Sequence, residues 1–243
     1  MTPTQGVLAE AWDLYKRHFL HFVTIAFVVY LVVAIVQALL TATLGWVGGL
    51  IAAILSTVAV FWVYGALTEA VSDVVDGRAD LSVGETFDRT RSKIGPIAGA
   101  GILAGIAITI GLFLLIVPGL ILLTIWCLIV PAIVLENRGV FDSFSRSQHL
   151  VSGYGWNVFG VGVVAFLIYL VFLIILGIVL APLQQGVATF ISNVVSGTLA
   201  APFVACVLTL LYFRLRHVKE GGMQAPPPPV AGPPPAQPPP GNI

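Results

Sequence analysis

The chain has 243 residues, of which 58% are hydrophobic and 9% are charged, whereas an ordinary soluble domain is about 25% charged. This is too few charged residues to form the surface of a soluble protein of this size. We therefore expect lipid to surround most of the chain. The formal net charge is zero, which excludes the strongly basic surface typical of nucleic-acid-binding proteins.

Six apolar runs are long enough to cross a membrane as helices, because a spanning helix needs about 20 residues, with about 17–25 as the working range. None of the runs alternates apolar and polar residues as the strands of a membrane barrel do. We therefore expect an all-α membrane protein with six transmembrane helices. The predicted spans cover residues 19–43, 46–69, 96–117, 119–135, 158–182 and 187–213.

Very short, uncharged connections follow the first, third and fifth predicted spans, whereas the other two links are longer and charged. Gly and Pro in the short connections end a helix at low cost. The sequence therefore predicts three helical hairpins, with turns at residues 44–45, 117–119 and 183–186. The first apolar run is longer than the about 7–15 residues of a signal-peptide core, so we expect it to be a retained span.

The positive charges are confined to one side of this arrangement. All 11 Lys and Arg residues lie before the first span, in the two charged links or after the last span. Because Lys and Arg are retained on the cytoplasmic side of a membrane, both termini and both charged links are expected in the cytoplasm. The expected location is the cytoplasmic membrane of a bacterium, with the chain crossing it six times.

A short pattern precedes each predicted hairpin, at residues 8–12, 83–87 and 140–144. Each copy has an aliphatic residue, an acid two positions later and an aromatic residue two positions after that. In a helix the aliphatic and aromatic residues share one face and the acid lies on another. Ser82 followed by Glu85 is typical of a capping box that starts the second copy. We expect three repeats of one unit, an amphipathic helix on the membrane surface followed by a transmembrane hairpin.

The domain organisation follows from these elements. Residues 1–18 are expected to form the first cytoplasmic amphipathic helix, and residues 19–217 the six-span membrane domain. Residues 218–243 are rich in proline, cannot form a core and are expected to be disordered with polyproline II character. Two interpretations of this tail stay open: a plain solvated tail, or a ligand for a domain with an aromatic groove.

Inside the membrane the informative residues are small or polar. Small residues recur every four positions in the second, third and sixth spans, which favours these as the inner helices and leaves the fifth span facing lipid. Asn193 and Ser196 of the sixth span are candidates for lining a small polar cavity, although such residues more often bond to neighbouring helices. Glu136 ends the fourth span, where it is within reach of Arg138 or Arg146 and can orient the following amphipathic helix.

No pattern in the chain indicates a reactive centre. It contains no phosphate-binding loop, nucleophile elbow, zinc motif or paired cysteine motif, and Cys127 and Cys206 lie apart in apolar spans. We therefore predict no catalytic, cofactor-binding or metal-binding residues and no enzyme activity.

The segment around the fourth span carries a resemblance. Pro131 to Glu136, then Phe144-Ser-Arg146-Ser147, Gly153 and Trp156, resembles the bacterial membrane-domain family named for glycerophosphoryl diester phosphodiesterases that carry it before their catalytic domain. The resemblance implies six spans and an association with membrane lipid metabolism. Hydrolysis in that family belongs to a separate domain, so no catalytic residue carries over.

Two functions of different kinds remain open. The first is a non-enzymatic scaffold or accessory protein, with the lipid bilayer and a cytoplasmic or membrane protein as partners through the amphipathic helices or the tail. The alternative is a transporter or lipid-handling protein with a site among the second, third and sixth spans near Asn193.

Overall fold

The computed structural model describes residues 3–77 and 81–221, and within these ranges every regular element is a helix. Five segments are long and apolar enough to cross a membrane, as expected for an all-α membrane protein. They are α2 (Phe19–Val75), α4 (Ile94–Leu114), the consecutive pair α5 (Ile116–Ile125) and α6 (Ile129–Glu136), α8 (Gly155–Leu180) and α9 (Gln185–Glu220).

Three short helices occupy the segments predicted to be amphipathic: α1 (Val7–Arg17), α3 (Val83–Arg91) and α7 (Val140–Val151). The predicted capping box is confirmed at the start of α3, because the Ser82 side chain accepts from the Glu85 amide and the Glu85 carboxylate accepts from the Ser82 amide. In α1 the buried residues recur every four positions, so one face of the helix is buried and the other is exposed.

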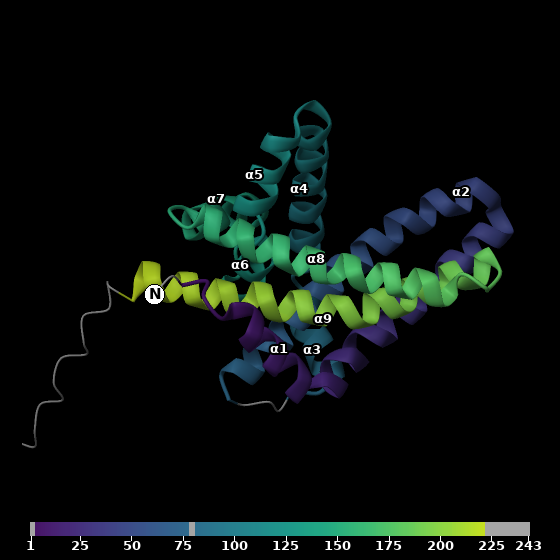
Figure 1. Ribbon diagram of the computed structural model, residues 1–243, viewed down its shortest axis with the longest axis horizontal. Helices are drawn as coiled ribbons and strands as arrows, with labels where there is room; N and C mark the ends of the chain where they lie inside the picture. Colours follow the sequence, from purple (N-terminus) through teal and green to yellow (C-terminus); the bar gives the residue numbers. More distant parts are fainter. Residues whose placement is uncertain (1–2, 78–80, 222–243) are drawn as a thin grey trace, which may run out of the picture.

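The long helix α2 contains a reversal at Gly45, where φ is 58° and ψ is −134°. Only glycine adopts such a conformation without strain, so this residue interrupts the helix at the predicted turn. Figure 1 shows α2 folding back on itself in this region. The other connections fall close to their predicted places, and α8 and α9 are joined by residues 181–184, two residues earlier than expected.

The turn between α4 and α5 differs from the prediction. The backbone reverses at Leu115, which is extended with φ −153° and ψ 126°, and α5 has begun by Ile116. Pro118 was expected in the turn but lies in the first turn of α5 instead. A proline is tolerated there because the first amides of a helix have no partner within the helix. At the other end of the chain, α9 continues to Glu220, so residues 218–220 are helical rather than part of a tail, and the remaining predicted tail, residues 222–243, lies outside the described residues.

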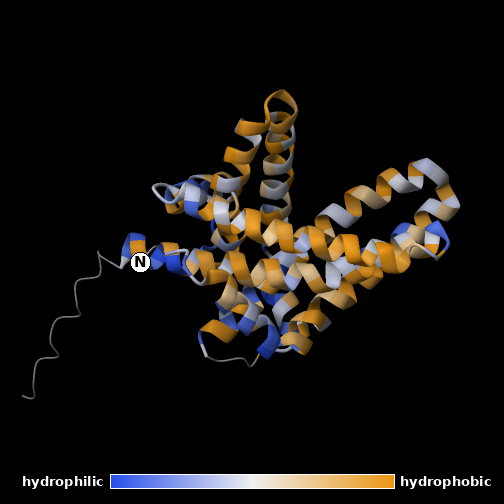
Figure 2. Ribbon diagram, viewed as in Figure 1, coloured by the Kyte–Doolittle hydropathy of each residue, from blue (hydrophilic) through white to orange (hydrophobic). Residues whose placement is uncertain are grey.

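The core lies where the short helices meet the ends of the long ones. The α2 and α9 helices make the largest interface, α4 packs against α2, and α1, α3 and α7 close over these contacts. Figure 1 shows the α4–α5 hairpin and the bend of α2 extending from the core in different directions. In Figure 2 these arms are mostly apolar in colour, whereas much of the polar colour lies on the short helices.

The predicted burial is confirmed for α9 and α8 but not for α4. The α4 helix was expected to be an inner helix, but its most apolar stretch is 22% buried, less than the 39% of the α5–α6 segment. The most apolar stretch of α9 is 56% buried, whereas that of α8, the predicted lipid-facing helix, is 6% buried. In α4 the close approach to α2 occurs at Gly101, where an added Cβ would lie 2.3 Å from Cζ of Phe61. Small residues therefore do let α4 and α2 pack closely.

Candidate functional site

The polar cluster at the meeting point of α6, α7 and α9 is the main candidate site. Glu136 is the last residue of α6, and Asn137 ends the helix in a left-handed conformation with φ 53°, which Asn tolerates better than most residues. Gly139 then starts α7, whose second turn carries Arg146. The sharp turn thus returns the chain so that an acid and a base ten residues apart face each other.

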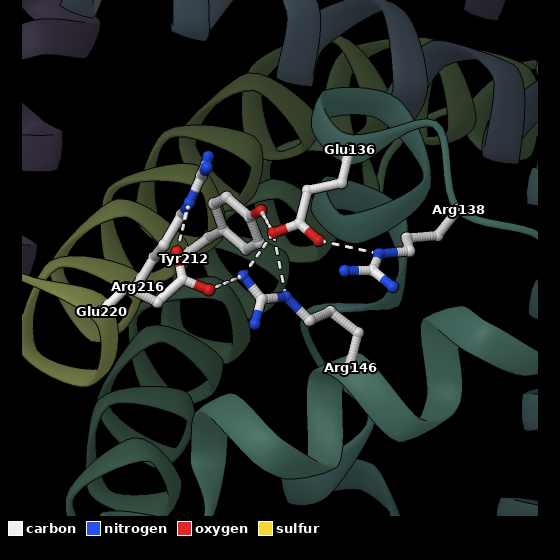
Figure 3. A network of polar contacts seen from close by, with 6 residues as sticks. All are labelled: Glu136, Arg138, Arg146, Tyr212, Arg216 and Glu220. Carbon is white, nitrogen blue, oxygen red and sulfur yellow. Dashed lines mark hydrogen bonds and ion pairs between the residues drawn. The ribbon is translucent and has the colours of Figure 1, made fainter. Parts of the chain in front are cut away.

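Glu136 is the centre of the cluster (Figure 3). Its Oε1 accepts hydrogen bonds from Nε of Arg146 at 2.8 Å and from Nη2 of Arg146 at 2.5 Å, and also from the hydroxyl of Tyr212. Its Oε2 accepts from Nε of Arg138 at 2.9 Å. The sequence predicted that Glu136 reaches Arg138 or Arg146, and the structure pairs it with both.

Arg146 extends the cluster to the end of α9. Its Nη2 contacts Oε1 of Glu220 at 2.5 Å, and Nε of Arg216 donates to the second oxygen of Glu220 at 2.9 Å. The Arg146 side chain is only 11% exposed. Partial burial opposes its charge, but hydrogen bonds to Glu136 and Glu220 outweigh that effect and raise the pKa of Arg146 above its ordinary value. Arg146 is therefore a permanent cation between two carboxylates.

These contacts link the three helices α6, α7 and α9. Charge-assisted hydrogen bonds from a planar guanidinium are among the stronger polar contacts, and removing one partner leaves a poorly solvated charge behind. Both carboxylates of the cluster, Glu136 and Glu220, accept from Arg146, so this one guanidinium links the three helices. The outer pair, Arg216 with Glu220, is more exposed and contributes less.

Ser147 joins the interrupted helix α5–α6 to α7. Its Oγ donates to the carbonyl of Ile125 at 2.7 Å and accepts from the amide of Leu128 at 3.1 Å, so it satisfies the backbone groups freed by the break. The break lies next to Pro131, which cannot donate to the preceding turn. Pro131 lies in the first turn of α6, and the helix is interrupted a few residues before it.

The predicted motif separates into two parts. Pro131, Glu136, Arg146 and Ser147 are brought together around α6 and α7. Gly153 instead provides a left-handed turn between α7 and α8, with φ 84°. Trp156 is 87% exposed on α8 and contacts only the ring of Phe159 among the aromatic contacts of the described residues.

The predicted intramembrane polar pair lies on α9, away from the cluster. Asn193 is exposed, and Ser196 is partly buried. Asn193 therefore faces away from the neighbouring helices. The structure does not bring this pair together with other polar groups of the second, third and sixth predicted spans.

Tyr212, Arg216 and Glu220 were missed by sequence reasoning. They occur at four-residue spacing and form one polar stripe along the end of α9. That spacing is the only signal in the sequence, and it does not say which helix the stripe faces.

The three short helices contact the long helices in matching ways. In each, the aromatic residue of the shared pattern lies edge-on against an aromatic ring of a long helix or its end. The three pairs are Trp12–Phe203, Phe87–Trp62 and Phe144–Trp126, with ring centroids 6.0, 5.0 and 4.8 Å apart. The contacted helices are α9, α2 and the α5–α6 break, respectively.

A buried hydroxyl follows each aromatic residue by three positions and also bonds to the contacted segment. The three bonds are Tyr15 to the Leu199 carbonyl at 3.2 Å, Trp62 to Thr90 at 3.2 Å, and Ser147 to the Ile125 carbonyl at 2.7 Å. An acid–arginine pair completes each contact. These pairs are Glu10–Arg214, Glu69–Arg89 and Glu136–Arg146. The short helices are thus held by ring, hydroxyl and charge contacts at once.

The described residues also contain no group of three or more His, Cys, Asp or Glu side chains arranged to hold a metal ion. Comparison with protein-family models, with curated proteins and with solved structures finds no match to any of them.

Proposed function

We propose that this chain is a six-span integral protein of a bacterial cytoplasmic membrane that acts as a non-enzymatic scaffold or accessory. Three observations support the six spans. The reversal at Gly45 divides α2 into two arms, each long enough to cross a bilayer. The α4–α5 and α8–α9 connections supply two further reversals. The positive charges gather at the ends away from these turns, which supports a cytoplasmic location for the short helices and both termini.

The attachment of the three short helices is the observation that carries the scaffold function. Each is fixed to a long helix by a ring pair, a hydroxyl bond and an ion pair. The matching contacts also support three repeats of one unit. Fixed in this way, each short helix presents an exposed polar face to a protein partner.

The outer faces of α3 and α7 are polar and exposed. Asp88 and Arg91 of α3 and Gln148 and His149 of α7 are all exposed. A preorganised surface loses little conformational entropy on binding, which suits an accessory protein that receives a partner at the membrane. The proposed link to membrane lipid metabolism rests on the resemblance of the segment from Pro131 to Trp156. The alternative site near Asn193 gains no support, because Asn193 is exposed.

Site-specific photo-crosslinking in native membranes tests this proposal. A crosslinking amino acid is placed at Gln148 on the exposed face of α7, and at Phe113, which is 90% exposed at the α4–α5 tip, as the matched control. We expect one defined protein adduct from position 148 and lipid adducts alone from position 113. Adducts that are the same at both positions, or no reproducible protein adduct at position 148, would contradict a scaffold role.

A further inference from the structure

A pocket of about 430 Å³ lies where α1 meets α2, beside the start of α3. It takes no part in the polar cluster around Glu136 or in the ring contacts of the short helices. Its lining combines basic and apolar side chains. The lining residues are Arg17, His18, Leu20, His21, Thr24 and Val83.

Two groups on the basic side of the pocket, Arg17 and Nδ1 of His18, are available to bind a ligand. Arg17 forms no ion pair with an acid among residues 3–77 and 81–221, whereas its neighbour Lys16 pairs with Asp13 at 2.9 Å. The Nδ1 atom of His18 is buried and has no hydrogen-bond partner within the described chain. An unpaired buried polar atom is uncommon in a folded protein and calls for a partner.

The backbone adds to the same electrostatic preference. The α2 helix begins at Phe19 without a side-chain cap, and its first turn contains no acid. The free amides and the helix dipole at such an end favour an anion. Asp73, the acid that acts electrostatically on His21, already accepts a hydrogen bond from the Leu81 amide at 3.2 Å. No carboxylate lines the pocket, so its polar side suits a phosphate group.

The other side of the pocket is apolar and open to the membrane. Leu20 is 77% exposed and the adjacent Phe19 is 43% exposed. These residues begin the apolar run that enters the hydrocarbon, one turn from the basic residues. A ligand in this pocket would therefore place its anionic group beside Arg17 and His18 and its apolar part beside Leu20. A free phosphate ion would not contact the apolar side of the pocket.

We propose that this pocket binds the phosphate headgroup of an anionic phospholipid. Arg17 and His18 contact the phosphate, and Leu20 contacts the first part of an acyl chain. This site goes beyond the proposed scaffold function, because it needs no protein partner and lies on a different part of the molecule from Gln148.

Native mass spectrometry of the purified full chain, titrated with dioleoyl phosphatidylglycerol, tests the site. Arg17→Gln is expected to weaken the first lipid-binding event about tenfold, because it removes a charge-assisted hydrogen bond to the phosphate. The matched control is Arg91→Gln, which removes an exposed cation at the end of α3 that does not line the pocket. The control is expected to change the binding less than about twofold.

A second variant separates a lipid from free phosphate. Leu20→Gln is expected to weaken phosphatidylglycerol binding while circular dichroism shows the helical content unchanged. Millimolar inorganic phosphate is expected to displace little of the lipid. Equal losses for Arg17→Gln and Arg91→Gln, or none, would overturn the site, and displacement by inorganic phosphate with no effect of Leu20→Gln would overturn the lipid assignment.

Discussion

Glu136 holds two arginines and a tyrosine at the end of α6, so its charge has the largest expected effect of any single residue in the cluster. Glu136→Gln keeps the shape of the side chain but leaves the nearly buried Arg146 with Glu220 as its remaining acid. We expect a loss of about 1–3 kcal/mol in the free energy of unfolding. Reversible unfolding in mixed micelles measures this quantity.

Arg138→Gln is the control for that experiment. It breaks a contact to the same carboxylate, but the Arg138 side chain is 45% exposed, so the expected loss is below about 1 kcal/mol. Equal losses of stability in the two variants would contradict the proposal that Glu136 stabilises the fold through the nearly buried Arg146.

Residue-level prediction succeeded where partners are close in sequence. Glu136, Arg138 and Arg146 stand on either side of one turn, so their pairing follows from an acid at the end of a predicted span and bases just after it. Tyr212 lies 76 positions from Glu136, and only the packing of α9 brings them together. Local patterns contain no information about that packing.

The start of α3 gives a prediction about an element. Hydrogen bonds from the side chain and the backbone amide of Ser82 hold the pKa of Glu85 below its usual range. The capping box is therefore intact at neutral pH, and its contribution is lost as the pH falls through that lowered pKa. Ser82→Ala should speed amide hydrogen exchange in α3 about fivefold at neutral pH, and acid should reduce the difference from the unmodified chain. An unchanged rate in α3 would show that the cap does not hold the helix.

The interface between α4 and α2 gives a second prediction about an element. Gly101→Ala places a methyl group against the ring of Phe61 and is expected to cost about 1–3 kcal/mol of stability. Gly105→Ala, one turn further along α4, meets nothing within 4 Å and should stabilise by up to about 1 kcal/mol through helix propensity. Thermal unfolding of the two variants side by side measures the difference. Equal effects at the two positions would mean that α4 and α2 are not in close contact.

Element positions were predicted well, and turns less well. The hydrophobic period and the charged links located the long and short helices, and Gly45 located the first reversal. Pro118 misled the prediction, because a proline marks either a turn or the first turn of a helix, and local sequence does not separate the two.

At the scale of the whole molecule, the short helices connect long helices that are far apart in the sequence. The α3 and α7 helices each pack on the long helix that precedes them in the chain, and α1 packs on α9, the last one. The contacts therefore close into a ring, in which the first short helix meets the end of the chain's last long helix. Sequence comparison of the three copies predicts similar helices but not this closure, since Trp12 and Phe203 belong to opposite ends of the chain.

The proposed topology has the three hairpin turns on one side of the membrane and the short helices on the other. It gives the last prediction. In a variant with Cys127 and Cys206 replaced by serine, single cysteines are introduced at Leu115, Gln184 or Gln148. A maleimide that cannot cross membranes should label positions 115 and 184 in cells whose cytoplasmic membrane is intact. It should label position 148 only after that membrane is opened, because the proposed topology puts α7, with the positive charges, on the cytoplasmic side. Labelling of positions 115 and 184 from opposite sides would require an odd number of crossings between them and would rule out the three-hairpin arrangement, even if each helix is correctly placed.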